Sequence, residues 1–311
     1  MPPEFLILGA ARSGTTALHA YLNQHPDVYM PLVKEPHFFA YGETAYDFKG
    51  PGDDRFVHTS LSRSDYGALF VGARPNQMRG DASATSLYVP RAAQRIERYV
   101  PEARMIAVLR DPVERAFSNY LLLVRDGREP CDSFTDALNR EAQRIRADWE
   151  HGWHYVQLGF YHDQLRRFYN RFDRDQIRVV LFEDFTDDPT GTVQQIYRFL
   201  EVDDTFVPDT SMRHNPSGRP RSWSLHWLLQ LAGVGAAVRR VLPDRLVDAV
   251  GRRAEPVIRQ MRRWKKHVIH RNLDRPSLPP EPAARLRNLY RDDIHRLESL
   301  IDRDLSHWLE D

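Results

Sequence analysis

Phe5-Leu-Ile-Leu-Gly-Ala-Ala-Arg-Ser-Gly-Thr-Thr16 is the stretch that decides the fold of this 311-residue chain. Its first four residues are apolar and have the length of a buried parallel strand. Gly9 ends this strand, and a segment with helical apolar spacing follows Gly14. A strand, a glycine loop and a helix together aim backbone N–H groups and a helix N-terminus at one point. We therefore expect a site for an anion, most often a phosphate, at residues 9–16.

The loop differs from a Walker A motif at one position. Walker A reads G-x-x-x-x-G-K-[ST], and its lysine reaches the β- and γ-phosphates of a nucleotide. Gly9 and Gly14 have the right spacing, but Thr15 stands in place of the lysine, and the cation of this loop is Arg12. This difference argues against an ATP-dependent kinase. For this segment taken alone, an ordinary βα turn with two glycines remains an alternative.

A second anion site is predicted further along the chain. Residues 105–109 are apolar and predict another buried strand, and Asp111-Pro112 is a favourable start for a helix. Arg110 stands at the carboxyl end of this strand. Ser118 follows eight residues later, about two helical turns on, so its hydroxyl is expected on the same side. A surface ion pair and a capped helix are the alternative explanations of these residues.

These segments, together with Lys-Glu-Pro-His-Phe-Phe at 34–39, resemble the sulfotransferases that use 3′-phosphoadenosine-5′-phosphosulfate. The resemblance is closest to the bacterial and heparan-sulfate-type branch, whose first loop typically reads K/R-[ST]-G-T-T. It implies an α/β fold, namely a P-loop-like three-layer α/β/α arrangement with a central parallel sheet and a helical C-terminal lid region. It also implies that the 5′-phosphosulfate is bound by the first loop and the ribose 3′-phosphate by an Arg…Ser pair. The residues implied are Arg12, Ser13, Gly14, Thr15 and Thr16 for the former, and Arg110 and Ser118 for the latter.

The same resemblance implies roles in catalysis. Glu35 matches the glutamate that heparan-type relatives use as general base, and His37 is its rival, because the ordinary pKa of histidine suits proton transfer. Arg12 is expected to stabilise the leaving phosphate, since arginine stays charged and binds oxyanions bidentately. Lys34, His37, Phe38 and Ser83 are expected on the acceptor side, although Phe38 equally suits a core position and Ser83 a turn.

Two later segments bear on the ligands. Heparan-type enzymes often read Glu-Lys-[ST]-Pro where this chain has residues 80–86, and Ala82 stands in place of the lysine, which argues against a polyanionic sugar acceptor. Phe182 is placed by the resemblance either against the adenine or in the core. Within 208–222, the resemblance implies that Arg219 and Arg221 close over the 3′-phosphate, and solvated linker arginines are the alternative.

Length and composition agree with a single large α/β domain over residues 1–311, and the resemblance implies that this is one sulfotransferase domain. The formal net charge of +1 excludes a globally basic nucleic-acid binder. Cys131 is the single cysteine, so no intrachain disulfide is possible and a reducing, cytoplasmic compartment is favoured. Neither a signal peptide nor a membrane-spanning run is expected. The thirteen histidines show no metal-ligand spacing, so no metal is expected.

Residues 223–275 predict a helical lid or insertion within that domain. Trp223 and Trp227 lie on one apolar helical face, and residues 252–275 hold nine Lys or Arg against two acids, a local charge of +7. A lid packed on the core is the favoured interpretation. A cap on the acceptor cleft, a contact with a partner and a peripheral contact with the inner face of an anionic membrane are the alternatives.

The function expected from these residues is in-line sulfuryl transfer from the phosphosulfate donor, without a metal, to a hydroxyl group. An amine is the less favoured acceptor group. The acceptor is a small molecule, a carbohydrate or a lipid-linked compound, and Glu35 removes its proton. Two alternatives are a small-molecule kinase that uses ATP and Mg²⁺, and a non-catalytic nucleotide-binding scaffold. The sequence carries no signal for the oligomeric state.

Overall fold

The computed structural model describes residues 2–42, 47–51, 61–211, 218–222, 224, 268, 272–274 and 276–310. The chain divides into two compact units. The first unit comprises Met1–Asn215 together with Leu278–Asp311, and the second comprises Pro216–Ser277. The second unit overlaps the region 223–275, for which the sequence predicts an insertion.

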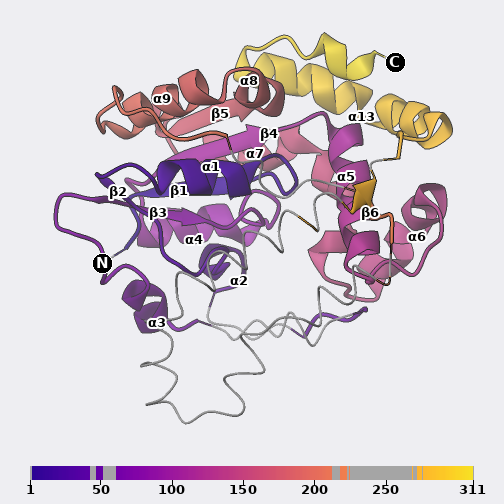
Figure 1. The fold of residues 1–311 in the computed structure, drawn as a ribbon, viewed down its shortest axis with the longest axis horizontal. Coiled ribbons are helices and arrows are strands. Elements are labelled where there is room, and N and C mark those ends of the chain that lie inside the picture. Colours follow the sequence, from indigo (N-terminus) through magenta and orange to yellow (C-terminus); the bar gives the residue numbers. More distant parts are fainter. Residues whose placement is uncertain are drawn as a thin grey trace. The chain divides into compact units, whose positions relative to one another are not determined.

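The first unit is built on a five-stranded parallel sheet with the strand order β2-β3-β1-β4-β5 (Figure 1). The central strand β1 is buried along its whole length, as its run of apolar residues predicts. Within it, Ile7 pairs with Ala82 on one side and with Ile106 on the other. The strands are β1 (Phe5–Gly9), β2 (Val28–Tyr29), β3 (Met78–Ala82), β4 (Arg104–Leu109) and β5 (Ile177–Leu181).

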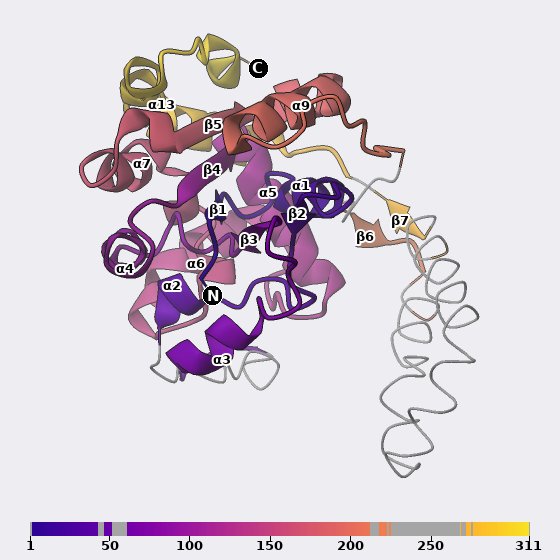
Figure 2. The ribbon, with the colours of Figure 1, turned by 90° about the vertical axis from the view of Figure 1, so that its left-hand side faces the viewer.

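Helices cover both faces of this sheet, so the predicted three-layer α/β/α arrangement is confirmed (Figure 2). Because successive strand residues point to opposite faces, Leu6 and Leu8 belong to one hydrophobic core and Phe5 and Ile7 to the other. The second of these cores includes residues of α1 (Thr15–Leu22) and α9 (Pro189–Leu200). The first includes residues of α4 (Arg91–Tyr99), α5 (Pro112–Arg125), α6 (Phe134–Arg146), α7 (Tyr161–Tyr169) and α13 (Pro280–Ile301).

The start of α5 follows the sequence prediction. The Asp111 carboxylate caps the helix by accepting hydrogen bonds from the backbone N–H groups of Val113 at 2.7 Å and Glu114 at 3.3 Å, and Pro112 occupies the first turn. The shorter elements of this unit are α2 (Phe38–Tyr41), α3 (Arg63–Ala68), α8 (Phe182–Asp187), η2 (His151–Trp153), η3 (Gln157–Gly159), η4 (Arg174–Gln176) and η5 (Ser306–Leu309).

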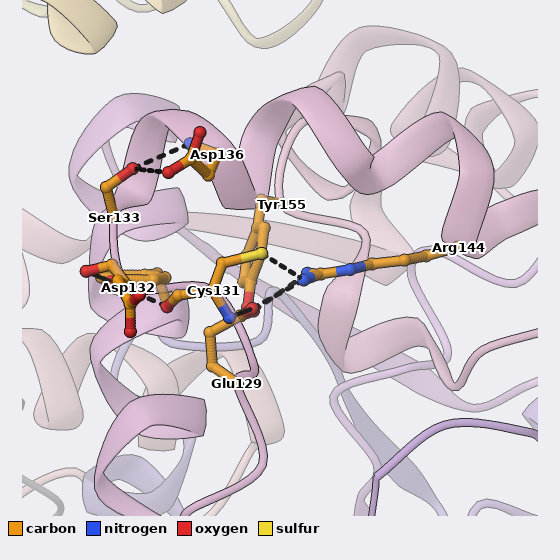
Figure 3. Close-up of polar contacts among 8 residues, drawn as sticks. Glu129, Cys131, Asp132, Ser133, Asp136, Arg144 and Tyr155 are labelled. Atoms are coloured by element: carbon orange, nitrogen blue, oxygen red, sulfur yellow. Dashed lines mark hydrogen bonds and ion pairs between the residues drawn. The ribbon is translucent and has the colours of Figure 1, made fainter.

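A buried ion pair ties α6 to the segment that follows α5 (Figure 3). Arg144 donates to both carboxylate oxygens of Glu129, at 2.9 and 2.6 Å, and also to the Cys131 Sγ at 3.1 Å. The Tyr155 hydroxyl donates to the same carboxylate. Burial and the neighbouring Glu129 carboxylate raise the pKa of the Cys131 thiol. The single cysteine is therefore a buried thiol inside a structural network.

The second unit contains a two-stranded antiparallel sheet of β6 (Arg219–Pro220) and β7 (Leu273–Asp274). The Arg221 N–H donates to the Asn272 carbonyl at 2.6 Å and continues this pairing. Near its end the region 223–275 contains the strand β7, whose backbone pairs with β6, and the helical lid or insertion stays a prediction. Trp223 and Trp227 lie outside the described residues. Among the helices that the structure describes, none has the length and apolar character needed to cross a bilayer.

Candidate functional site

Several of the predicted site residues follow the ends of parallel strands. The loop after β1, the segment after β3, Arg110 after β4 and Phe182 after β5 all follow the carboxyl ends of neighbouring strands. In open α/β sheets, ligands bind at this edge. The loop after β1 and the segment after β3 are closely packed at this edge. A Cβ on Gly9 would lie only 2.7 Å from the carbonyl oxygen of Ala84, so only glycine fits there.

Gly14 shapes the start of α1. Its φ of +90° lies in the left-handed region, and a Cβ at this position would lie 3.2 Å from the Phe182 ring and 3.3 Å from Phe185. Gly14 caps α1 without a side-chain hydrogen bond. The first turn of a helix presents backbone N–H groups that have no partner within the helix, so this end of α1 suits an anion.

Arg12 connects the two anion sites that the sequence predicts separately. The Arg12 Nε donates to the Ser118 Oγ at 3.2 Å, and the Arg110 Nη1 donates to the Arg12 carbonyl oxygen at 3.5 Å. The loop after β1 therefore contacts both the end of β4 and the middle of α5. Ser13 and Thr15 are buried in the same loop.

Positive charge is concentrated around Arg12. Burial lowers the pKa of its guanidinium to about 10, and the charges of Arg125, Arg110 and Arg115 contribute in the same direction. Arg12 is nevertheless charged at neutral pH. Two carboxylates offset part of this charge: Glu114 accepts from Arg110 at 2.8 Å, and Asp126 accepts from Arg125 at 2.9 Å. A bound anion would relieve the remaining repulsion between these arginines.

Sequence reasoning missed Arg125. This residue ends α5 seven residues after Ser118, and helical side chains seven residues apart lie on the same face. That spacing is the signal that could have found it.

Phe182 and Tyr161 position Arg110. The Cζ of Arg110 lies 4.9 Å from the centroid of the Phe182 ring, which is a cation–π arrangement. The Tyr161 hydroxyl donates to the Arg110 carbonyl oxygen at 3.0 Å. Phe182 packs on the core that contains α1 and α9, and it also contacts the position of Gly14. The ring therefore lies between the two parts of the predicted donor site.

Glu35 and His37 lie next to each other in a backbone of unusual conformation. Their φ values of 59° and 55° are both in the left-handed region. The His37 Nε2 is 3.7 Å from a carboxylate oxygen of Glu35, and the other oxygen contacts the Lys34 ammonium. The Glu35 side chain is 33% exposed, so solvent and a substrate can reach it. The Nδ1 of His37 lies 2.8 Å from the Thr85 hydroxyl oxygen.

The segment after β3 holds His37 in place. The His37 N–H donates to the Ser83 Oγ at 3.0 Å, and the Ser83 hydroxyl donates to Asp81 at 2.7 Å. The other oxygen of Asp81 accepts from the Tyr66 hydroxyl at 2.6 Å. Burial raises the pKa of Asp81 to about 6. Sequence reasoning missed Asp81 and Tyr66.

The other predicted residues have different surroundings. The Phe38 ring is 3% exposed and stacks on Tyr66 with 4.3 Å between ring centroids, so it packs in the core. Arg219 and Arg221 belong to the second unit, and their predicted contact with a 3′-phosphate stays a prediction. Within the described ranges, no three His, Cys, Asp or Glu residues are grouped so as to hold a metal ion.

Comparisons with known proteins place this arrangement in a family. The model of the sulfotransferase family matches residues 3–206. The crystal structure of a sulfotransferase from Alicyclobacillus acidocaldarius is 34% identical in sequence and superposes with a TM-score of 0.75, covering 99% of each chain.

Curated relatives include heparan sulfate glucosamine 3-O-sulfotransferase 3B1 of Mus musculus, which is 30% identical over 204 residues. Carbohydrate sulfotransferase 15 of Mus musculus is 25% identical over 254 residues. Each alignment covers 64% of this chain but only 46% and 44% of the respective relative, so the match spans less than half of their length. The family model and the bacterial structure together show that the chain belongs to the sulfotransferase family of enzymes.

Proposed function

We propose that this protein transfers a sulfuryl group from 3′-phosphoadenosine-5′-phosphosulfate to a hydroxyl group of an acceptor. The observation that carries the proposal is the contact between Arg12 and Ser118 beside Arg110. These contacts join a loop suited to one phosphate with Arg110 and Ser118, which are suited to another. A donor with phosphates at both ends of a nucleoside fits such a surface better than ATP, since Thr15 stands where a kinase needs its lysine.

The donor would be held by three groups of residues. We propose that residues 12–16 and the N-terminus of α1 bind the 5′-phosphosulfate, where backbone N–H groups and the Arg12 guanidinium converge. Arg110 and Ser118 bind the 3′-phosphate. Arg219 and Arg221 are proposed to close over that phosphate. The Phe182 ring lies next to Arg110 and Gly14, and we propose that it contacts the nucleoside between the two phosphates.

The proposed chemistry uses Glu35 as a base and Arg12 as a cation. The acceptor oxygen forms a bond to sulfur while the bond from sulfur to the bridging phosphate oxygen breaks. The acceptor proton passes to the Glu35 carboxylate, and the negative charge left on the phosphate is stabilised by Arg12. Arginine keeps its proton and acts here through charge and hydrogen bonds. Placement of the reacting groups and electrostatic stabilisation supply most of the acceleration.

Glu35 is favoured over His37 as the base by their surroundings. The Nδ1 of His37 is engaged with Thr85, and its Nε2 faces Glu35. The imidazole is therefore suited to orient the carboxylate, while the carboxylate is the more accessible of the two groups. Lys34 lies beside Glu35, and we propose that it contacts the acceptor together with His37. Ser83 accepts from the His37 N–H, and Phe38 stacks on Tyr66, so we propose that both hold the acceptor side in shape.

One sequence difference from the relatives, at position 82, bears on the class of acceptor. Those relatives are named for heparan sulfate glucosamine and other carbohydrates. Ala82 takes the place of a lysine that the resemblance leads us to expect, so this chain has one cation fewer near the acceptor. We therefore propose a small-molecule, carbohydrate or lipid-linked hydroxyl acceptor that is not a polyanionic sugar.

The test distinguishes loss of the catalytic base from loss of donor binding. Release of adenosine 3′,5′-bisphosphate from the donor is measured with a panel of phenol, sugar and lipid alcohols for wild type, Glu35→Gln, His37→Gln and the control Glu97→Gln, an exposed partner of Arg171. Glu35→Gln is expected to lower kcat by about 10²–10⁴-fold and to leave affinity for the bisphosphate unchanged. His37→Gln is expected to lower kcat less, and the control not at all. Wild-type turnover in Glu35→Gln would contradict the assignment of the base.

A further inference from the structure

The carboxylate of Asp81 has no part in the proposed chemistry, yet it is 1% exposed at the carboxyl end of β3. A buried charge is unfavourable unless hydrogen bonds compensate for it. Both of its oxygens are used: one accepts from the Ser83 hydroxyl at 2.7 Å and the other from the Tyr66 hydroxyl at 2.6 Å. Two neighbouring elements, α3 and the segment after β3, therefore converge on Asp81.

Ser83 extends this network toward Glu35. A serine hydroxyl has one proton to donate, and Ser83 directs it at Asp81. Its oxygen lone pairs are thereby turned toward the His37 N–H, which donates to it at 3.0 Å. Ser83 is 2% exposed, so water does not compete for these bonds. The orientation of the hydroxyl, and with it the acceptor for the His37 N–H, is set by Asp81.

The backbone that donates this hydrogen bond needs an external restraint. Glu35 and His37 both have left-handed φ values, which residues with a Cβ adopt only where surrounding contacts fix them. His37 is held twice by the segment after β3, through its N–H by Ser83 and through its ring by Thr85. The direction of the Glu35 carboxylate depends on this turn, because Glu35 lies two residues before His37.

We propose that Asp81 is a positioning residue, which acts through Ser83 to hold the Glu35–His37 turn so that the Glu35 carboxylate faces the acceptor. This inference rests on the proposed role of Glu35 as the base. Tyr66 serves Asp81 by fixing its second oxygen. The network runs from Tyr66 through Asp81 and Ser83 to the His37 N–H, on the side that we assign to the acceptor.

The experiment compares Asp81→Asn and Ser83→Ala with wild type and with Asp293→Asn. Asp293, in α13, is a matched control. Its carboxylate is also buried, at 2% exposed, and accepts a hydrogen bond from the His162 N–H. Asp81→Asn is expected to speed amide hydrogen exchange at His37 at least tenfold and to lower kcat at least tenfold. The donor KM and the affinity for adenosine 3′,5′-bisphosphate should change by less than twofold. A merely structural role would not divide the effect between kcat and KM in this way.

Ser83→Ala is expected to reproduce both effects, and it decides the matter if Asp81→Asn does not fold. Asp293→Asn should leave exchange at His37 and kcat at wild-type values. Wild-type exchange at His37 and wild-type kcat in Ser83→Ala would overturn the inference. A wild-type protein that binds no adenosine 3′,5′-bisphosphate would instead contradict the proposed function, and the inference would fall with it, whatever the exchange results.

Discussion

Replacing Gly14 by alanine tests the donor loop through a single methyl group. The native φ of +90° is unfavourable for a residue with a Cβ by about 1–2 kcal/mol. The added Cβ would also lie 3.2 Å from two atoms of the Phe182 ring and 3.3 Å from Phe185, and such crowding typically costs about 1–3 kcal/mol. We therefore expect Gly14→Ala to lower the free energy of unfolding by about 2–5 kcal/mol.

The same substitution should weaken donor binding. The Phe182 ring lies under the Arg110 guanidinium at 4.9 Å, so a ring displaced by the new methyl group would move the cation that we assign to the 3′-phosphate. A tenfold loss of affinity for adenosine 3′,5′-bisphosphate corresponds to about 1.4 kcal/mol, and we expect a loss of at least this size.

Urea denaturation and calorimetric titration measure the two effects. Gly67→Ala is the control, because it lies within α3 and a Cβ there would meet nothing within 4 Å. This control should be neutral or slightly stabilising, since alanine favours a helix over glycine by about 1 kcal/mol. A Gly14→Ala protein with wild-type stability and wild-type affinity would refute the reasoning about this loop.

Two further predictions concern buried charges. Arg144→Ala leaves the Glu129 carboxylate, whose side chain is 0% exposed, without its cation, and should lower the free energy of unfolding by about 3–5 kcal/mol; a loss below about 1 kcal/mol in urea denaturation would contradict this account of the ion pair. Burial lowers the pKa of His154 from 6.5 to about 4, so the folded state binds this proton less readily than the unfolded state. Stability should therefore be lost as pH falls from 6.5 to 4, by up to about 3 kcal/mol. His154→Gln should remove that part of the pH dependence, and an unchanged slope would count against the assignment.

The local elements of the site could be predicted from the sequence. The strand, loop and helix over residues 5–22 and the capped start of α5 are specified by short-range patterns of apolar residues, glycine, Asp111 and Pro112. The order of the strands places their ends together, and the parallel α/β fold confirms that expectation.

The contacts that complete the site could not be predicted in the same way. Arg12 and Ser118 are 106 residues apart in sequence, and His37 and Ser83 are 46 apart. Periodicity describes one element at a time and says nothing about which side chains meet across a sheet. The role of Asp81 could not be predicted for the same reason, since its partner Tyr66 lies on a different element.

The central claim is that the loop after β1 and the end of β4 bind a nucleoside with phosphates at both ends, and thermal stabilisation tests it most directly. Adenosine 3′,5′-bisphosphate without metal, and ATP with Mg²⁺, are each added to wild type, to Arg110→Ala and to Arg178→Ala, an exposed arginine of β5. At a hundred times Kd the ligand should stabilise the native state by about 2.7 kcal/mol.

We predict that the bisphosphate raises the melting midpoint of wild type and Arg178→Ala, and that Arg110→Ala loses most of this shift. Comparison of the shifts, and not of the absolute midpoints, separates binding from any loss of stability in the variant. A response to ATP with Mg²⁺ alone, or a bisphosphate shift that is unchanged in Arg110→Ala, would contradict the proposed donor site.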